Sequence, residues 1–213
     1  MKIGIIGATG KAGQLILEEA LRRGHDVTAI IRNAEKITDA QVAVLEKDAF
    51  DLQAADVAGF DVVVNAFGAL AGEETLHVEL GRKLIDVVKE APNTRLIVVG
   101  GAGSLFVDPE QTIRLIDTPE FPEAYYATAS NQGENLKDLQ QSEGLDWTFI
   151  SPAAFFDPAG KRTGSYQLGK DQLILNAKGD SYISYADYAI ALVDEIENPK
   201  HRKARFTVVA EQA

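Results

Sequence analysis

The sequence predicts an α/β protein with a doubly wound, mainly parallel sheet and helices on both faces. The first observation is a short apolar strand, Lys2–Ile6, that runs into glycines spaced three residues apart, Gly7, Gly10 and Gly13, and then into a helical pattern. The second is that apolar, β-branched runs alternate with segments of helical period along the rest of the chain. The third is size, because 213 residues with 46% hydrophobic content can bury one substantial core. We therefore expect a single domain over residues 1–213.

The first helix follows the glycine turn directly, and Gly24 ends it just before the next apolar run. Its apolar residues repeat at helical spacing and are Leu15, Ile16, Leu17, Ala20 and Leu21. Further apolar runs along the chain predict buried parallel strands at Val27–Ile31, Val42–Leu45, Asp61–Asn65, Leu96–Val99 and Trp147–Ile150.

Two long helices are predicted between these strands. Thr75–Glu90 places Leu76, Leu80 and Leu84 along one helical face, and Ala124–Glu143 is the second candidate. The end of the chain adds three more segments. They are a short apolar segment at Tyr182–Ser184, a helix over Ala186–Glu197 that stops before Pro199, and a last strand at Arg205–Val209.

Two segments that contain proline interrupt the alternation, Gln111–Pro122 and Ser151–Gly169. We expect both to be long loops at the carboxyl ends of strands, where loops usually form the binding crevice. Residues 151–185 are therefore predicted to form a small region on the substrate side of the domain.

The composition excludes several kinds of site. The chain has no cysteine, and His25, His77 and His201 lack the spacing of metal ligands, so we expect no metal centre. A formal net charge of -11 argues against binding to nucleic acid or to an anionic membrane. No window reaches the roughly 18 consecutive apolar residues of a membrane span, and the amino end enters a strand directly, so we expect a cytoplasmic protein.

The glycine turn is predicted to hold a phosphate group. Gly7 permits the tight turn out of the strand, Gly10 lets backbone amides approach a pyrophosphate, and Gly13 lets the helix lie close to the sheet. The amino end of the helix then faces the anion. An ordinary glycine-rich turn between a strand and a helix would show the same residues, but the flanking apolar strand and helix favour the phosphate site.

Four motifs give the chain its resemblance to a known family. It resembles the short-chain dehydrogenase/reductase superfamily, in particular the atypical branch with NmrA-like proteins, biliverdin reductase B-like proteins and NAD(P)H-flavin reductases. The resemblance covers almost the whole chain and implies a Rossmann fold that binds NAD(P). Its motifs are Gly7-Ala-Thr-Gly10-Lys-Ala-Gly13, Asp61-Val-Val-Val-Asn-Ala66, Gly144-Leu-Asp-Trp-Thr-Phe-Ile-Ser-Pro152 and Ile183-Ser-Tyr-Ala-Asp187-Tyr-Ala189.

Arg32 indicates which dinucleotide is bound. It ends the second strand about twenty residues after the glycine turn, where an NAD-specific site usually has an acid for the ribose 2′-hydroxyl. A guanidinium there can instead hold a 2′-phosphate, which favours NADPH and leaves NAD as the alternative. A solvated loop arginine is the other interpretation.

The resemblance implies further contacts to the cofactor. Asp48 corresponds to the aspartate that accepts a hydrogen bond from the adenine amino group, although a turn aspartate is nearly as good an interpretation. Phe67 could equally belong to the core. The residues implied in cofactor binding are Gly7, Thr9, Gly10, Lys11, Ala12, Gly13, Arg32, Asp48, Ala66, Phe67 and Gly68.

The catalytic centre departs from the superfamily pattern of Tyr-x-x-x-Lys. Alignment of the motifs places Tyr126 at the tyrosine position and Ser130 at the lysine position, so the lysine is missing. A tyrosine without that cation is a poor base at neutral pH, which disfavours ordinary alcohol dehydrogenation. Ser104 lies near the usual serine position of the family and is the second catalytic candidate, or it serves only the backbone.

Hydride transfer to a flavin, a quinone or a biliverdin-like acceptor can proceed without that lysine, because the acceptor delocalises the charge. We therefore predict an NADPH-dependent reductase of a small, flat, conjugated substrate. The candidate substrate residues are Phe106, Tyr125, Phe155, Phe156 and Arg162, with Lys161 beside the last. The alternatives are a dinucleotide-binding redox sensor without turnover, similar to some NmrA-like proteins, and, more weakly, an epimerase. The sequence gives no indication of oligomeric state.

Overall fold

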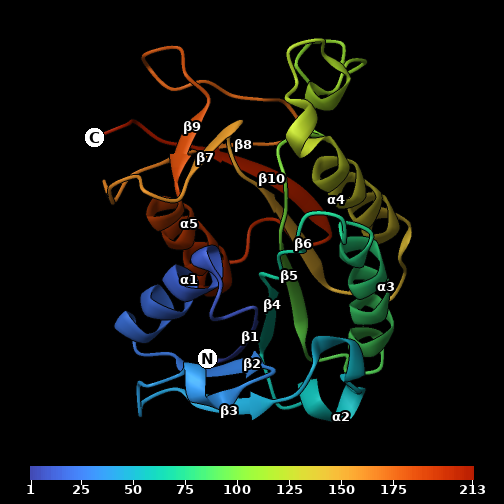
Figure 1. The fold of residues 1–213 in the computed structure, drawn as a ribbon, viewed down its shortest axis with the longest axis vertical. Helices are drawn as coiled ribbons and strands as arrows, with labels where there is room; N and C mark the ends of the chain where they lie inside the picture. Colours follow the sequence, from blue (N-terminus) through green and yellow to red (C-terminus); the bar gives the residue numbers. More distant parts are fainter.

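The computed structural model describes residues 1–213 and has a central eight-stranded sheet (Figure 1). The strand order is β3-β2-β1-β4-β5-β6-β10-β8, and only the pairing of β8 with β10 is antiparallel. The strands of this sheet are β1 Lys2–Ile6, β2 Asp26–Ile31, β3 Ala43–Glu46, β4 Val62–Asn65, β5 Arg95–Val99, β6 Trp147–Ser151, β8 Gln167–Gly169 and β10 Ala204–Val209. The α/β fold class predicted from the sequence is confirmed.

Helices cover both faces of the sheet. Figure 1 shows α1 and α5 on one face and α3 and α4 on the other, and the members of each pair contact one another. The α-helices are α1 Lys11–Arg22, α2 Ala54–Val57, α3 Leu76–Lys89, α4 Glu123–Gln141 and α5 Tyr185–Glu197. Short 3₁₀ turns, which the sequence did not predict, occupy Ala34–Lys36, Ala49–Asp51 and Leu115–Asp117.

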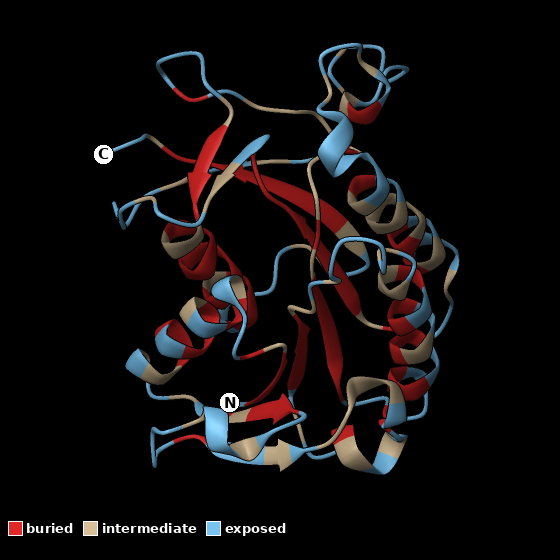
Figure 2. Ribbon diagram, viewed as in Figure 1, coloured by how far each residue is buried: buried red, intermediate tan, exposed pale blue.

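The core consists of two apolar layers, one on each face of the sheet. Ile3 and Ile5 of β1 pack in the layer with Ile16 of α1, whereas Ile6 packs with Leu80 of α3 in the other. Because successive side chains of a strand point to opposite faces of the sheet, a strand that is apolar at successive positions contributes side chains to both layers. Figure 2 shows the central strands buried between helices whose outer faces are exposed.

Two expectations about individual elements were wrong. Val42–Leu45 was expected to be a buried strand, but β3 is the edge of the sheet, and three of its four residues are exposed. Ser151–Gly169 was expected to be a loop, but it contains β7, Phe155–Asp157, and also β8. β7 pairs in parallel with β9, Tyr182–Ser184, to form a separate two-stranded sheet. These short strands depend on partners that are distant in the sequence, which local patterns do not reveal.

The topology reverses the strand order next to β1. β1 lies between β2 and β4. After β1 the chain adds β2 and β3 on one side of it, and then crosses over to add β4 on the other side. Ligands of open α/β sheets bind outside the carboxyl ends of the strands at such a reversal of strand order. None of the helices is long and apolar enough to cross a membrane.

Candidate functional site

The glycine turn brings β1, α1 and the end of β4 into close contact. Gly7 has a φ of +74°, and a Cβ there would lie 2.5 Å from the carbonyl oxygen of Ala66. A Cβ on Gly13 would overlap the carbonyl group of Gly7. Both positions therefore require glycine, one for its left-handed backbone and the other for the approach of helix to turn.

The amino end of α1 is free to receive an anion. Its N-cap residue is Gly10, which offers no side-chain cap, and its first turn contains no acid. The backbone amides of Lys11, Ala12 and Gly13 have no acceptor inside the helix, because the first N–H groups of any helix lack one. A Cβ on Gly10 would meet only the oxygen of Gly7, at 3.2 Å, so the outer side of the turn is open. These residues fit the pyrophosphate of a nicotinamide dinucleotide.

Arg32 and Asp48 lie at the same edge of the sheet as the glycine turn. Arg32 follows the last residue of β2, is exposed and makes no ion pair. Asp48 follows β3, and its Oδ1 accepts a hydrogen bond of 3.1 Å from the backbone N–H of Phe50 as the cap of a 3₁₀ turn. The turn aspartate that the sequence left open is therefore present, and the second oxygen of Asp48 makes no hydrogen bond within the protein.

The segment after β4 combines packing with open space. Phe67 makes edge contacts with the rings of Phe50, at 5.9 Å between centroids, and His77, at 5.6 Å. A Cβ on Gly68 would touch nothing within 4 Å. Burial lowers the pKa of His77 below its ordinary value, so its ring stays neutral beside Phe67. Phe67 is thus held by aromatic contacts, whereas the space next to Gly68 is open.

Three of the predicted residues, Ser104, Phe106 and Tyr126, line one cavity of about 690 Å³. It lies between α4, the segment before the 3₁₀ turn at Leu115–Asp117, and β10. No residue of the glycine turn lines it. Arg205 of β10 also lines this cavity and was not among the predicted site residues.

Arg205 holds the Ser104 side of the cavity. Its side chain is 3% exposed, and its Nε donates to Oδ1 of Asp171 at 2.8 Å. Its Nη1 donates to Oγ of Ser104 at 3.1 Å, so the hydroxyl hydrogen of Ser104 is free to be donated elsewhere. A single arginine within an otherwise apolar strand is the one signal in the sequence that could have found it.

Tyr125 and Tyr126 leave the first turn of α4 about 100° apart, as successive helical residues do. Tyr126 lines the cavity, and its ring makes an edge contact of 6.4 Å with Phe121. The ion pair with Asp117 raises the pKa of Arg114, and the nearby phenol of Tyr126 adds to the rise.

Tyr125 does not line the cavity. Its phenol lies close enough to Tyr185 to add to the pKa increase that burial causes there.

Phe155 and Phe156 lie on β7, apart from the cavity of Tyr126. The ring of Phe156 packs on Tyr185 at 3.9 Å and on buried Tyr188 at 4.8 Å, whereas Phe155 is 57% exposed. Tyr185 at the start of α5 thus joins Phe156 in an aromatic wall that the sequence did not predict. The two predicted groups of substrate residues therefore lie on different elements, one around Tyr126 and one around Phe156.

Arg162 lies against α1 and not in either aromatic group. Its Nη2 is 3.4 Å from Oε2 of Glu19. The next two residues are fixed by Asp187 of α5, whose buried carboxylate accepts hydrogen bonds from the backbone N–H groups of Thr163 and Gly164 and from the hydroxyl of Thr163. Asp187 therefore ties the loop that carries Arg162 to the amino end of α5.

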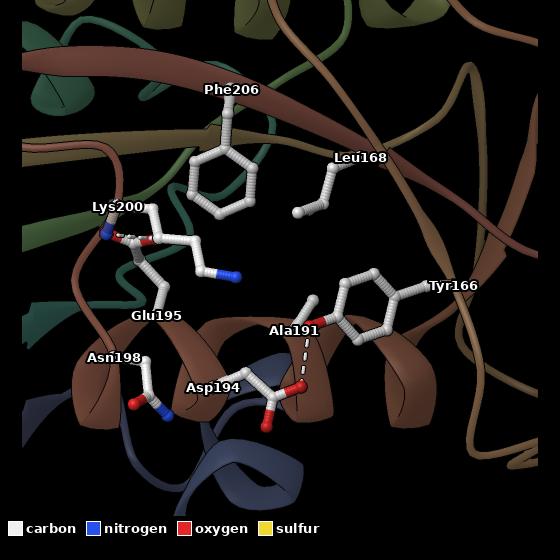
Figure 3. Close-up of a pocket in the computed structure, with 8 residues that line it drawn as sticks. All are labelled: Tyr166, Leu168, Ala191, Asp194, Glu195, Asn198, Lys200 and Phe206. Atoms are coloured by element: carbon white, nitrogen blue, oxygen red, sulfur yellow. Dashed lines mark hydrogen bonds between the residues drawn. The ribbon is translucent and has the colours of Figure 1, made fainter.

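A second cavity, of about 260 Å³, lies on the other face of the sheet, between α5 and the strands β8 and β10 (Figure 3). Oδ2 of Asp194 accepts from the hydroxyl of Tyr166 at 2.6 Å, and Oε1 of Glu195 accepts from Arg95. Both carboxylates are thus used by the protein itself, and the cavity is at the carboxyl end of α5, which repels anions. We assign it no part in dinucleotide binding.

Comparison with known proteins agrees with this geometry. YwnB of Bacillus subtilis (strain 168) is 70% identical over 211 residues, which cover 99% of each chain. The crystal structure of SP1627, a candidate NADH-flavin reductase from Streptococcus pneumoniae TIGR4, has a TM-score of 0.94 and 43% identity over 99% of this chain and 100% of that one. ChuY, an anaerobillin reductase from Escherichia coli O157:H7, shares the fold, with a TM-score of 0.76 and 23% identity over the whole of both chains.

A family model described as NAD(P)H-binding matches residues 7–199, from the first glycine of the turn to the residues just after α5. The match thus includes the open amino end of α1 and the parallel strands β2 to β6, and it ends before β10. The chain belongs to this NAD(P)H-binding family, and its bound cofactor is a nicotinamide dinucleotide.

Proposed function

We propose that the protein is an NAD(P)H-dependent reductase that transfers hydride to a flavin or to a related conjugated acceptor such as a quinone. The observation that carries the proposal is the pairing of an open dinucleotide turn at Gly10 with an α4 that has Ser130 where the superfamily has lysine. The nearest lysine along this helix, Lys137, pairs with Glu134. The chain binds a hydride donor and lacks the residue that would activate a tyrosine for alcohol chemistry.

The residues of this chain would contribute position more than proton transfer. The bound dinucleotide would supply the hydride, which carries two electrons and one proton, and water would supply the second proton that completes reduction of the acceptor. The glycine turn would fix the pyrophosphate, while Tyr125, Phe155 and Phe156 would offer aromatic surface to a flat ring. Ser104, whose oxygen is held by Arg205, and Tyr126 would place polar atoms of the substrate.

NADPH is the proposed preference over NADH. Arg32 is exposed and has no ion-pair partner, so its guanidinium is free to bind a 2′-phosphate. The 43% identity with a candidate NADH-flavin reductase supports a flavin as the acceptor. A second candidate function, a redox sensor that binds the dinucleotide without turnover, is favoured by the same absence of lysine at Ser130.

A screen of NADPH oxidation separates the two functions. The purified chain would be incubated with NADPH and, in turn, FMN, FAD, riboflavin, quinones and biliverdin, and the loss of absorbance of the reduced nicotinamide would be followed. We expect turnover with at least one flavin or quinone. Stoichiometric binding of NADPH with no oxidation by any of these acceptors would instead identify the sensor.

A further inference from the structure

The corner formed by the ends of β2 and β3 carries two groups of opposite charge. Ile31 is paired with Glu46 in the sheet, so Arg32 and Glu46 reach the same edge together. Oε1 of Glu46 accepts a hydrogen bond of 3.1 Å from the backbone N–H of Ala34. This hydrogen bond holds the carboxylate of Glu46 against the turn that begins with Arg32. Its other oxygen, Oε2, makes no hydrogen bond within the protein.

These two groups favour different dinucleotides. An exposed guanidinium after β2 attracts a 2′-phosphate, whereas a carboxylate at this corner accepts a hydrogen bond from a 2′-hydroxyl and repels a phosphate. The acid of an NAD-specific site normally follows the second strand. Here the carboxylate comes from the neighbouring strand, through the hydrogen bond of Glu46 to Ala34.

We infer that Glu46 is a specificity-determining residue that weakens the binding of NADPH, supports the binding of NADH, and so allows this chain to use both. The inference rests on the proposed role of Arg32 as the 2′-phosphate ligand. The side-chain oxygen of Asn33 already accepts from the backbone N–H of Glu35 at 2.9 Å, and no hydrogen bond holds the carboxylate of Glu35 over the turn as Ala34 holds that of Glu46.

Glu35 provides a matched control. It lies in the 3₁₀ turn at Ala34–Lys36, two residues from Asn33, is exposed, and makes no side-chain hydrogen bond or ion pair. Glu35→Gln and Glu46→Gln change the net charge by the same amount within one corner. Only Glu46 has its carboxylate fixed over the turn, so only its substitution should change the ratio of the two affinities substantially.

The test is calorimetric titration of the wild type and both variants with NADPH, NADH, adenosine 2′,5′-bisphosphate and adenosine 5′-monophosphate. We expect Glu46→Gln to bind NADPH and the bisphosphate about three- to tenfold more tightly, which is the size of one or two screened charge contacts. NADH and the monophosphate should be unchanged or up to about threefold weaker, the loss of one weak hydrogen bond. The gain should shrink at high salt.

Failure of the inference and failure of the proposed cofactor preference give different results. An equal NADPH to NADH affinity ratio in Glu46→Gln and Glu35→Gln would overturn the role of Glu46 and leave Arg32 untouched. Equal losses of both dinucleotides in Arg32→Ala would instead remove Arg32 from the 2′-phosphate site, and Glu46 with it. Glutamine keeps an oxygen for the N–H of Ala34, so the turn is retained, and a circular dichroism melt verifies this for each variant.

Discussion

Tyr126 is the residue whose role most directly tests the proposed chemistry. Tyr126→Phe keeps the ring on Phe121 and removes the hydroxyl. Because the proposed mechanism takes the proton from water, we expect kcat to fall by less than the 10²–10⁴-fold that is typical for loss of a general acid or base. The kcat of the wild type and of Tyr126→Phe is measured from steady-state NADPH oxidation over a range of pH, with the acceptor at a saturating concentration.

Tyr125→Phe is the matched control, since it removes the same atom from the adjacent residue, which faces Tyr185 and not the cavity. A thousand-fold loss for folded, cofactor-binding Tyr126→Phe, with a small change for Tyr125→Phe, would show that the phenol of Tyr126 is an essential proton donor. It would overturn the positional mechanism.

The glycines of the turn should respond differently to a side chain. At Gly10 the backbone φ of −79° suits any residue, and an added Cβ meets only the oxygen of Gly7. We therefore expect Gly10→Val to remain folded and to lose dinucleotide binding. Gly13→Ala should instead lower the melting temperature, because its Cβ overlaps the carbonyl of Gly7.

Thermal melts and NADPH titration of the two glycine variants separate these effects. Tight dinucleotide binding by folded Gly10→Val would contradict the pyrophosphate site, whatever happens at Gly13.

At the scale of elements, α3 and α4 pack so closely at Gly81 that a larger residue does not fit there. Gly81 of α3 is buried against Asn135 of α4, whose Nδ2 is itself buried and has no hydrogen-bond partner. Glycine to alanine inside a helix normally gains about 1 kcal/mol of stability. Here a Cβ would overlap the amide of Asn135, so we expect Gly81→Ala to cost roughly 1–3 kcal/mol in the free energy of unfolding.

Substitution of the partner tests the origin of this cost. In the background Asn135→Ala, the change Gly81→Ala should be neutral or stabilising, and urea unfolding of the four chains gives the coupling energy. Additive effects of the two substitutions would show that the contact between Gly81 and Asn135 is not responsible.

The sequence predicted those elements whose signal is local. The isoleucines of β1, the three glycines and the helical period of α3 each determine their element from adjacent residues, and all of them were found. β7 and β8 could not be found, since each has three residues and forms only against β9 or β10. The exposure of β3 depends on its place at the sheet edge, which the run Val42–Leu45 does not encode.

The candidate site follows the same division. The glycine turn follows β1 and Arg32 follows β2, and local patterns identify both strands. Their position at the carboxyl edge of the sheet could therefore be predicted from the sequence. The directions of Tyr125 and Tyr126 required the register of α4 against the sheet. Tyr185 and Arg205 join the site only through contacts across more than one element, with Phe156 in one case and Ser104 in the other.

At the scale of the whole molecule, the buried ion pair of Arg95 and Glu195 links β5 to α5. Their side chains are 5% and 3% exposed, and Glu195 also accepts hydrogen bonds from the backbone and the ring of His201. Burial opposes ionisation of Glu195, but the hydrogen bonds from His201 and Arg95 outweigh it and hold its pKa below the ordinary value.

This lowered pKa makes the stability depend on pH in one direction. A carboxyl with a lower pKa in the folded state stabilises the protein above its unfolded pKa, about 4.3 for glutamate, and this stabilisation is lost as the pH falls through the folded value. We expect Glu195→Gln to cost about 3–5 kcal/mol at pH 7, because buried Arg95 then loses its hydrogen-bonded counter-charge and keeps only Asp146, at 4.0 Å.

Urea unfolding of the wild type and Glu195→Gln from neutral to acidic pH checks this prediction. The difference between them should shrink below about pH 4.3, where the unfolded glutamate is protonated. Glu90→Gln, at an exposed position after α3, is the control and should show no such change. A difference that stays constant with pH would contradict a lowered pKa for Glu195.

The place of β10 in the sheet has a consequence for biosynthesis. β10 is the last strand of the chain, yet it lies inside the sheet, between β6 and β8. While residues 204–209 are still within the ribosome, β6 has an unpaired edge and β8 has no partner at all. Emerging chains therefore expose a hydrogen-bonding edge that attracts other chains, and the sheet is completed only after translation of its final strand.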